Sequence, residues 1–168
     1  MCVRTGDQQG VMASLGLAPM RPATFALATS VVSDDPDRLV FVTPELNGWT
    51  VVAGGWCDPS DDDRGEDVRL LVEKVSKQYG EAHAYCISEY SEYSAWLIAK
   101  DGRTVRRYSE ETPALAIGLP LPVERRHLDA LGVSVSPEEM HTKVESDPAM
   151  DEAFCEFFVR LQCSHGGR

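Results

Sequence analysis

The chain has 168 residues, of which 43% are hydrophobic, and its formal net charge at pH 7 is −11. This length and composition are typical of one globular domain with a sizeable core. The negative charge repels phosphate backbones and disfavours nucleic-acid binding, and no window is apolar enough to cross a membrane. Because the first residues make a poor signal peptide, we expect a cytoplasmic protein.

Cysteine usage and motif searches exclude several common classes of protein. Five cysteines, an odd number without a CxxC pair, argue against a disulfide framework and against a zinc ribbon. The chain has no GxSxG, Walker, GxGxxG or HExxH motif, so the usual hydrolase, nucleotide and dinucleotide signatures are missing. The prediction is therefore a protein without a metal or a cofactor.

The first third of the chain is predicted to begin as a flexible arm over residues 1–20. A short helix over Arg21–Val32 follows, with apolar side chains at helical spacing. Two valine-rich strands, Leu39–Thr43 and Trp49–Ala53, flank the turn pair Asn47-Gly48, so a hairpin is expected there.

The segment from Asp58 to Asp67 is the most acidic in the chain. An EF-hand loop fails in both possible frames, because neither frame has glycine at its sixth position or glutamate at its twelfth. We interpret the acids as the opening of a helix over Glu66–Tyr79, with Asp63 and Glu66 spaced as a capping-box variant. That helix has an apolar stripe and a glycine stop at Gly80.

A strand over Ala82–Ser88 and a central hairpin complete the predicted sheet. The hairpin pairs Tyr93–Ala99 with Arg103–Tyr108 around Asp101-Gly102, a sequence typical of a type I′ turn. In the regular register, Trp96 faces Arg107 and the two share one face of the sheet. The guanidinium of Arg107 would then stack on the indole of Trp96.

The last third of the chain is predicted to be mostly helical. After an extended crossing over Thr112–Pro122, a helix is expected over Val123–Leu131, and Ser136 caps the next one. The last helix, Pro148–Leu161, carries phenylalanines on one stripe. We expect that stripe to pack on the core, and the alternative is a dimer or partner surface.

Together these elements predict an α+β fold with one domain over residues 21–163 and a flexible tail over residues 164–168. Its sheet is predominantly antiparallel, with about five strands. One helix is inserted between the second and third strands, and the C-terminal helices pack on the sheet.

Four stretches of the chain carry a resemblance to a known group of proteins. They read VFVTPELNGWTVVAGGWCDP, VSKQYGEAHAY, SAWLIAKDGRTVRRY and AIGLPLPVERRHLDALGV, and the resemblance covers Leu39 to Val133. The chain resembles small actinomycete proteins of unassigned function that share the pattern VTPELxGWT…GGWCDP…SAWLIAxDGxxxRRY. The resemblance implies a compact α+β protein, in genomes that use such proteins as biosynthetic accessories and immunity partners. It implies no active-site residues.

Candidate catalytic residues are few. Cys57, after a strand and close to a helix start, is the best placed of the thiols, but free cysteines are usually buried as small hydrophobic residues. An acid–base site can combine His83 or Tyr85 with Glu110 or with Glu89 and Glu92. A zinc site from Cys57, Asp58, His83 and Cys86 is disfavoured, because the odd spacing of His83 and Cys86 sends them to opposite faces of a strand.

Two hypotheses for function remain. In the first, the chain is an acidic cytoplasmic binding protein, of the immunity or accessory type, whose partner is a basic protein. Its contact set would be Trp56, Glu89, Tyr90, Glu92, Tyr93 and the run Asp61–Asp63. In the second, it is a small enzyme or ligand-binding protein of natural-product biosynthesis that holds a small molecule. Its pocket would be lined by Trp49, Tyr85, Trp96, Arg106, Arg107 and Tyr108.

Overall fold

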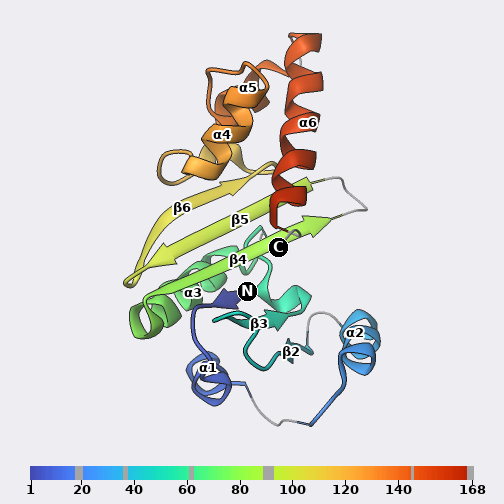
Figure 1. Cartoon of the computed structure of the whole chain (residues 1–168), viewed down its shortest axis with the longest axis vertical. Coiled ribbons are helices and arrows are strands. Elements are labelled where there is room, and N and C mark those ends of the chain that lie inside the picture. Colours follow the sequence, from blue (N-terminus) through green and yellow to red (C-terminus); the bar gives the residue numbers. More distant parts are fainter. Residues whose placement is uncertain (18–20, 36–37, 61–62, 89–92, 145, 166–168) are drawn as a thin grey trace.

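The computed structural model describes residues 1–17, 21–35, 38–60, 63–88, 93–144 and 146–165. Within them the chain forms one antiparallel sheet of six strands in the order β2-β3-β1-β4-β5-β6 (Figure 1). The predicted α+β class is confirmed, although the sheet has six strands instead of five. The strands are β1 (Cys2–Val3), β2 (Phe41–Val42), β3 (Thr50–Ala53), β4 (Glu81–Ser88), β5 (Tyr93–Lys100) and β6 (Arg103–Ser109).

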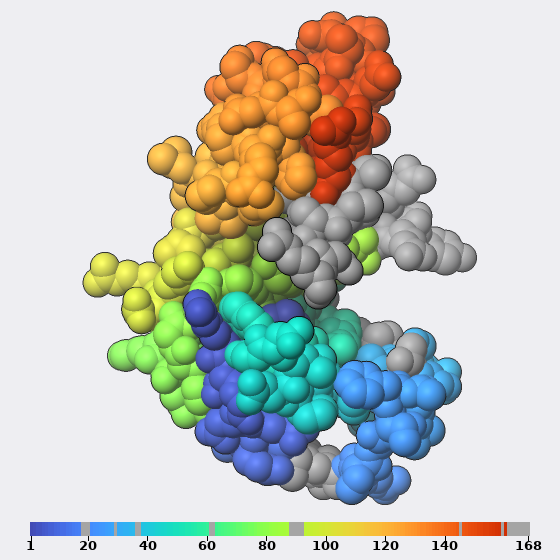
Figure 2. All heavy atoms as spheres, in the orientation of Figure 1, coloured from blue at the N-terminus to red at the C-terminus, as the bar shows by residue number. Residues whose placement is uncertain are grey.

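The sixth strand comes from the segment predicted to be a flexible arm. Strand β1 lies in the middle of the sheet, where Cys2 pairs with Val51 of β3 and with His83 of β4, and Val3 is fully buried. Helix α1 (Gln8–Leu15) follows, and Figure 2 shows the N-terminal residues in dark blue against the cyan of the β3 region. For residues 1–17 the prediction is wrong, because a two-residue strand is too short to show a period. Residues 18–20 lie outside the described part.

The remaining helices cover both faces of the sheet. They are α2 (Phe25–Asp34), α3 (Gly65–Tyr79), α4 (Pro122–Ala130), α5 (Pro137–Lys143) and α6 (Pro148–His165), with short 3₁₀ turns η1 (Gly55–Cys57) and η2 (Pro113–Leu115). Figure 1 shows α4, α5 and α6 together beyond β5 and β6, with α1 and α2 at the other end of the molecule. The sheet therefore has a core on each face.

The two cores differ in their side chains. The core under α3 is aliphatic and is built from Val3, Val52, Val68, Val72, Val75, Ala82, Ala84, Leu97 and Ala99, with α1 added at its edge. The core under α4, α5 and α6 is aromatic and contains Trp96, Tyr108, Leu128, Met140, Phe157 and Phe158. Small residues on β4 and β5 let α3 approach the sheet closely, whereas the larger gap on the other face is filled by rings.

Most turns and helix ends form where the local sequence predicts them. Both residues of each turn pair have positive φ, with 51° and 86° at Asn47 and Gly48 and 49° and 82° at Asp101 and Gly102. At α5, Ser136 and Glu139 form the predicted capping box. The N-cap of α3 is Arg64 without a side-chain cap, so the capping role predicted for Asp63 is wrong. Helix α6 continues to His165, into the predicted tail, and residues 166–168 lie outside the described part.

The central hairpin departs from its predicted register through a β-bulge. The turn sets Lys100 opposite Arg103 and Ala99 opposite Thr104, as expected, but Ile98 then pairs with Arg106. Val105 is therefore an extra residue in β6, and every residue after it changes face relative to the regular ladder.

The bulge reverses which arginine is buried. Trp96 pairs with Tyr108, and Arg106 lies on their face with its guanidinium carbon 5.6 Å from the Tyr108 ring centre. Arg107 lies on the α3 face, 4.0 Å from the Glu66 carboxylate. The predicted stacking of Arg107 on Trp96 is wrong for this reason.

Candidate functional site

Three residues of the predicted contact set, Trp56, Asp63 and Tyr93, belong to segments that meet at one end of the sheet. The loop before α3, the facing ends of β4 and β5 and the end of β6 meet there, as contacts of Asp58 with Cys86 and Tyr93 and of Glu110 with Ser94 show. We call this surface the acidic end and define it by the described residues Trp56, Asp58, Asp63, Glu66, Asp67, Tyr93, Glu110 and Glu111. The predicted contact residues Asp61, Asp62, Glu89, Tyr90 and Glu92 lie outside the described part.

A hydrogen-bond cluster around Asp58 joins the segments of the acidic end. Its carboxylate accepts hydrogen bonds from the Cys86 thiol at 2.9 Å and from the Tyr93 hydroxyl at 3.3 Å. The Ser60 hydroxyl donates to the other carboxylate oxygen at 2.5 Å, and the Ser60 backbone N–H donates to the same oxygen at 2.8 Å. One aspartate thus connects the loop before α3 with two strands that are distant from it in sequence.

The surroundings of this cluster favour the protonated forms of its two donors, the Cys86 thiol and the Tyr93 hydroxyl. Burial, followed by the hydrogen bond to Asp58, raises the pKa of the Cys86 thiol to about 11. Burial also raises the pKa of the Tyr93 hydroxyl well above its usual value. Because a thiol attacks as its thiolate, this arrangement makes Cys86 a structural donor and a poor nucleophile.

Glu110 closes the open end of the central hairpin and has a shifted pKa. Its carboxylate accepts a hydrogen bond of 2.8 Å from the Ser94 N–H, and its own N–H donates to the Ser94 carbonyl at 3.2 Å. Burial raises the pKa of Glu110 to about 7, although the Ser94 N–H favours the ionised form. The charge of the acidic end therefore changes in the physiological pH range.

We expect Glu110 to make stability depend on pH between its unfolded pKa and about 7. Because the pKa of Glu110 is higher in the folded protein, this carboxyl stabilises the fold in full below its unfolded pKa of about 4.3. That stabilisation is lost as pH rises through 7. The variant Glu110→Gln, which cannot ionise, should lose less stability than the wild type between pH 5 and pH 8. Urea unfolding at both pH values measures this difference, and equal slopes for the two proteins would contradict it.

A second group of titratable side chains lies along one face of β4. Glu81, His83 and Tyr85 occupy alternate positions, so all three point to the same side. His83 Nε2 lies 3.1 Å from Glu81 and His83 Nδ1 lies 2.9 Å from the Tyr85 hydroxyl. The Trp49 ring lies 5.0 Å from the imidazole ring. The arrangement is a carboxylate–imidazole–phenol row on the face that α3 does not cover.

Two cations hold the carboxylate of this row. Burial opposes ionisation of Glu81, but hydrogen bonds from Lys100, His83 and Arg4 outweigh burial and lower its pKa to about 2. Lys100 and Arg4 approach to 3.0 Å and 2.9 Å. Burial raises the pKa of the Tyr85 hydroxyl far above its usual value. The row therefore orients an imidazole with a permanent carboxylate, which is the geometry of a general base, but its phenol is not activated.

The predicted catalytic residues do not form one site. Cys57 is buried in the aliphatic core, and burial raises the pKa of its thiol. Glu110 hydrogen-bonds Ser94, whose strand partner Ile87 is four positions along β4 from His83. The structure thus pairs His83 with Glu81 and Tyr85; of the predicted carboxylate partners, Glu89 and Glu92 lie outside the described residues.

The residues predicted to line one pocket lie in different environments. Trp96, Arg106 and Tyr108 are buried between the sheet and the C-terminal helices, and Arg107 lies on the other face. Arg106 pairs with Glu124 at 3.0 Å and with Glu138 at 2.6 Å. Of the side chains that we assigned to ligand binding, Trp96, Arg106 and Tyr108 therefore fill a core, whereas Trp49 and Tyr85 lie beside His83.

The sequence did not indicate that Glu124 and Glu138 pair with a buried arginine. Glu124 is 1% exposed and Glu138 is 22% exposed at the side chain. Helix α4 begins at Pro122, one residue before its predicted start, and the start of α5 after Ser136 was predicted. The spacing of the two glutamates from proline resembled ordinary N-terminal acids. Only the bulge in β6, which turns Arg106 inward, gives them a buried partner.

In the described part of the chain, no group of three or more His, Cys, Asp or Glu side chains is placed to hold a metal ion. His83 and Cys86 do lie on opposite faces of β4, since His83 contacts Trp49 and Cys86 contacts Asp58. Within the same residues, no helix combines the length and apolar character of a membrane span.

No protein-family model, curated protein or solved structure matches the chain.

Proposed function

We propose that this chain is an acidic cytoplasmic binding protein, of the immunity or accessory type, that binds a basic protein through its acidic end. The observation that carries the proposal is the convergence of three distant segments on that surface. The loop before α3, which carries Trp56 and Asp63, is joined to β4 and β5 by the contacts of Asp58 with Cys86 and Tyr93. Glu110, which follows β6 and precedes Glu111, is joined to β5 through Ser94.

The arrangement suits recognition of a basic surface. Opposite charges steer a partner during encounter and fix its orientation, and aromatic side chains supply contact area. Trp56 is held by the Arg64 guanidinium, 4.9 Å from its ring centre, and Tyr93 is held by Asp58 and Ser60. Both aromatic rings are therefore fixed before a partner arrives, which reduces the entropy lost on binding.

The row Glu81–His83–Tyr85 supports a second candidate function, that of a small enzyme or ligand-binding protein of natural-product biosynthesis. An imidazole oriented by a carboxylate is a recurrent feature of acid–base sites. The ligand would contact the exposed part of this row beside Trp49 instead of the aromatic core. We rank it second because both ring nitrogens of His83 already have protein partners.

Reversing charge at the acidic end is expected to weaken binding of the basic partner. In the double variant Asp63→Lys with Glu111→Lys, both changed side chains are exposed. We expect capture of the partner from lysates of the producing cells to fall at least about fivefold, since charge pairs at an interface govern association. Carbodiimide cross-linking, which joins carboxylates to lysines, should connect the acidic end of the wild type to lysines of the same partner.

A matched control separates the position of the charge from its amount. Asp151 and Glu152 are exposed on α6, away from the acidic end, and replacing both with lysine changes the net charge equally. This variant should capture the partner as the wild type does. The proposal fails if the wild type captures no protein, or if the two double variants lose capture equally.

A further inference from the structure

The segment that follows β6 turns back and lies along the outer edge of that strand. It runs from η2 to the residue before Pro122, where α4 starts, and we call residues 113–121 the strap. Ile117 of the strap exchanges two backbone hydrogen bonds of 2.9 Å with Arg107 of β6. Strand β6 therefore has a backbone partner on each side, β5 on one side and the strap on the other.

The strap approaches β6 very closely at the β-bulge. Gly118 has a φ of 78°, and a Cβ placed on it would lie 2.1 Å from the carbonyl oxygen of Val105 and 3.1 Å from the carbonyl carbon. Because both are backbone atoms, they cannot turn aside as a side chain would, so this position requires glycine. The Gly118 carbonyl also accepts a hydrogen bond of 3.3 Å from Arg106 Nη1. One glycine thus contacts both residues that form the bulge.

The Val105 carbonyl faces the strap because the strand is bulged. Along a regular antiparallel strand, successive residues turn their backbone groups to opposite sides. The Thr104 N–H donates to Glu73 and so points away from β5. In a regular ladder, Val105 would come next and turn its carbonyl toward Ile98 of β5. Only the bulged form of β6 therefore presents this carbonyl to Gly118.

Other features of the hairpin do not select the bulged register by themselves. The turn and the two ladder pairs next to it are the same in both registers. Since Arg106 and Arg107 are adjacent, either register places a guanidinium on the face of Trp96. Burial of Tyr108 favours the bulged register, whereas the ladder pair lost at the bulge opposes it. The contact with the strap adds to the bulged register alone.

From this geometry we infer that the strap, through Gly118, holds β6 in the bulged register and thereby positions Glu110 at the acidic end. When a bulge is lost, every residue after it changes face. In the bulged register the Glu110 carboxylate accepts the Ser94 N–H at 2.8 Å. Without the bulge, Glu110 would pair with the next residue of β5, on the other face. The consequence for partner binding rests on the proposed function, whereas the positioning of Glu110 does not.

Two glycines with similar conformations provide the first test. Gly132 has a φ of 70°, and a Cβ added to it would meet no described atom within 4 Å. Gly118→Ala and Gly132→Ala therefore share the strain of a left-handed alanine, but only the first also meets the Val105 carbonyl. We expect the urea midpoint of unfolding to fall at least about twice as far for Gly118→Ala. Equal falls would contradict the inference, because the strap would then have room for a side chain.

NMR measures the register of β6 directly. The wild type should show cross-strand contacts between backbone protons of Ile98 and Arg106, and Gly118→Ala should lose them. Burial raises the pKa of Glu110 to about 7 in the wild type, and this pKa should fall in the variant as the carboxyl loses its buried place. If both observations stay as in the wild type, the core alone holds the register and the inference is wrong.

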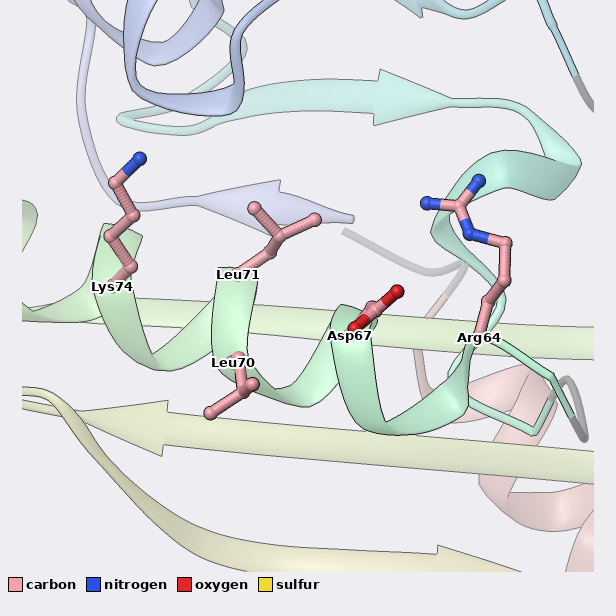
Figure 3. Close-up of a pocket in the computed structure, with 5 residues that line it drawn as sticks. All are labelled: Arg64, Asp67, Leu70, Leu71 and Lys74. Atoms are coloured by element: carbon pink, nitrogen blue, oxygen red, sulfur yellow. The ribbon is translucent and has the colours of Figure 1, made fainter.

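An internal reference shows whether the rest of the fold is intact. A shallow depression on α3 is lined by Arg64, Asp67, Leu70, Leu71 and Lys74 (Figure 3). Figure 3 shows Leu71 and Lys74 pointing from α3 toward β1. Their amide signals should therefore stay in place in Gly118→Ala while those of β6 move.

Deletion of Val105 provides a rescue of the same variant. The deletion removes the carbonyl that meets Gly118 and leaves a regular ladder in which Arg106 still pairs with Ile98, so later residues keep their faces. Combined with Gly118→Ala, it should restore the contact between Ile98 and Arg106 and the raised pKa of Glu110. This result is expected even if Gly118→Ala alone does not fold, and a failed rescue would overturn the inference.

Capture of the basic partner should follow the same pattern. We expect capture to fall in Gly118→Ala, although this residue lies outside the acidic end, and to recover when Val105 is also deleted. Capture that is equal in Gly118→Ala and in the wild type would show that the strap does not affect the acidic end. If the wild type captures no protein, the proposed function fails, and the NMR measurements still decide whether the strap sets the register.

Discussion

Replacing Glu124 with leucine is expected to lower the free energy of unfolding by about 3–5 kcal/mol, because it leaves a buried arginine without its main partner. Arg106 is fully buried and Glu124 is 1% exposed. Two contacts of 3.0 and 3.1 Å join the Arg106 Nε to the carboxylate oxygens. The same carboxylate accepts the Leu121 N–H at the start of α4, so the variant also loses a helix cap.

Urea unfolding of matched variants separates the buried charge from general packing. Glu138→Leu should cost much less, since Glu138 is 22% exposed and Arg106 keeps its pair with Glu124. The double variant Arg106→Leu with Glu124→Leu should recover much of the loss, because a buried ion pair replaced by apolar side chains is often neutral. A loss below about 1 kcal/mol for Glu124→Leu, the level of an exposed pair, would show that the pair is hydrated in solution.

The ion pair illustrates what the sequence could and could not predict. The turns Asn47-Gly48 and Asp101-Gly102 and the capping box at Ser136 were predictable, because each depends on residues within four positions of one another. The face of Arg106 was not predictable in this way. It depends on whether Val105 is paired or bulged, and that choice follows from the fit of the whole sheet against the C-terminal helices.

Strand β1 escaped prediction for a related reason. Two residues, Cys2 and Val3, hold a central position because β3 and β4 lie on either side and supply their hydrogen-bond partners. A free segment of that length has no periodicity and no intrinsic stability as a strand. Its structure is a property of the sheet and not of the local sequence.

The candidate site was predictable in composition but not in arrangement. Trp56, Tyr93 and the acids before α3 are conspicuous in the sequence, and the structure brings their segments to one end of the sheet. The side chain that joins them, Asp58, is 28 residues from Cys86 and 35 from Tyr93. Sequence patterns describe separations of a few residues, so a contact over these distances required the fold.

Replacing Phe157 with alanine is the second variant with a large expected effect, a loss of about 3–5 kcal/mol in the free energy of unfolding. Phe157 is fully buried in the aromatic core, and its ring centre lies 5.0 Å from that of Phe158. Phe158 in turn contacts Trp96 and Tyr108 at 6.0 Å each. Truncation at this position opens a cavity where α6 meets the sheet, so the C-terminal helices should loosen together.

This variant also tests the alternative that the phenylalanine stripe of α6 is a dimer surface. If Phe157 belongs to the core of each molecule, its replacement lowers stability by the same amount at every protein concentration. The half-buried Phe154, whose ring centre is 4.8 Å from that of Phe158, is the matched control on the same helix and should cost less when replaced with alanine. Urea unfolding and sedimentation velocity over a hundredfold range of concentration distinguish the two cases. The alternative would be supported if the stability loss of Phe157→Ala shrinks with dilution and if the variant dissociates a dimer. The phenylalanine stripe of α6 would then form an interface between two copies of the chain.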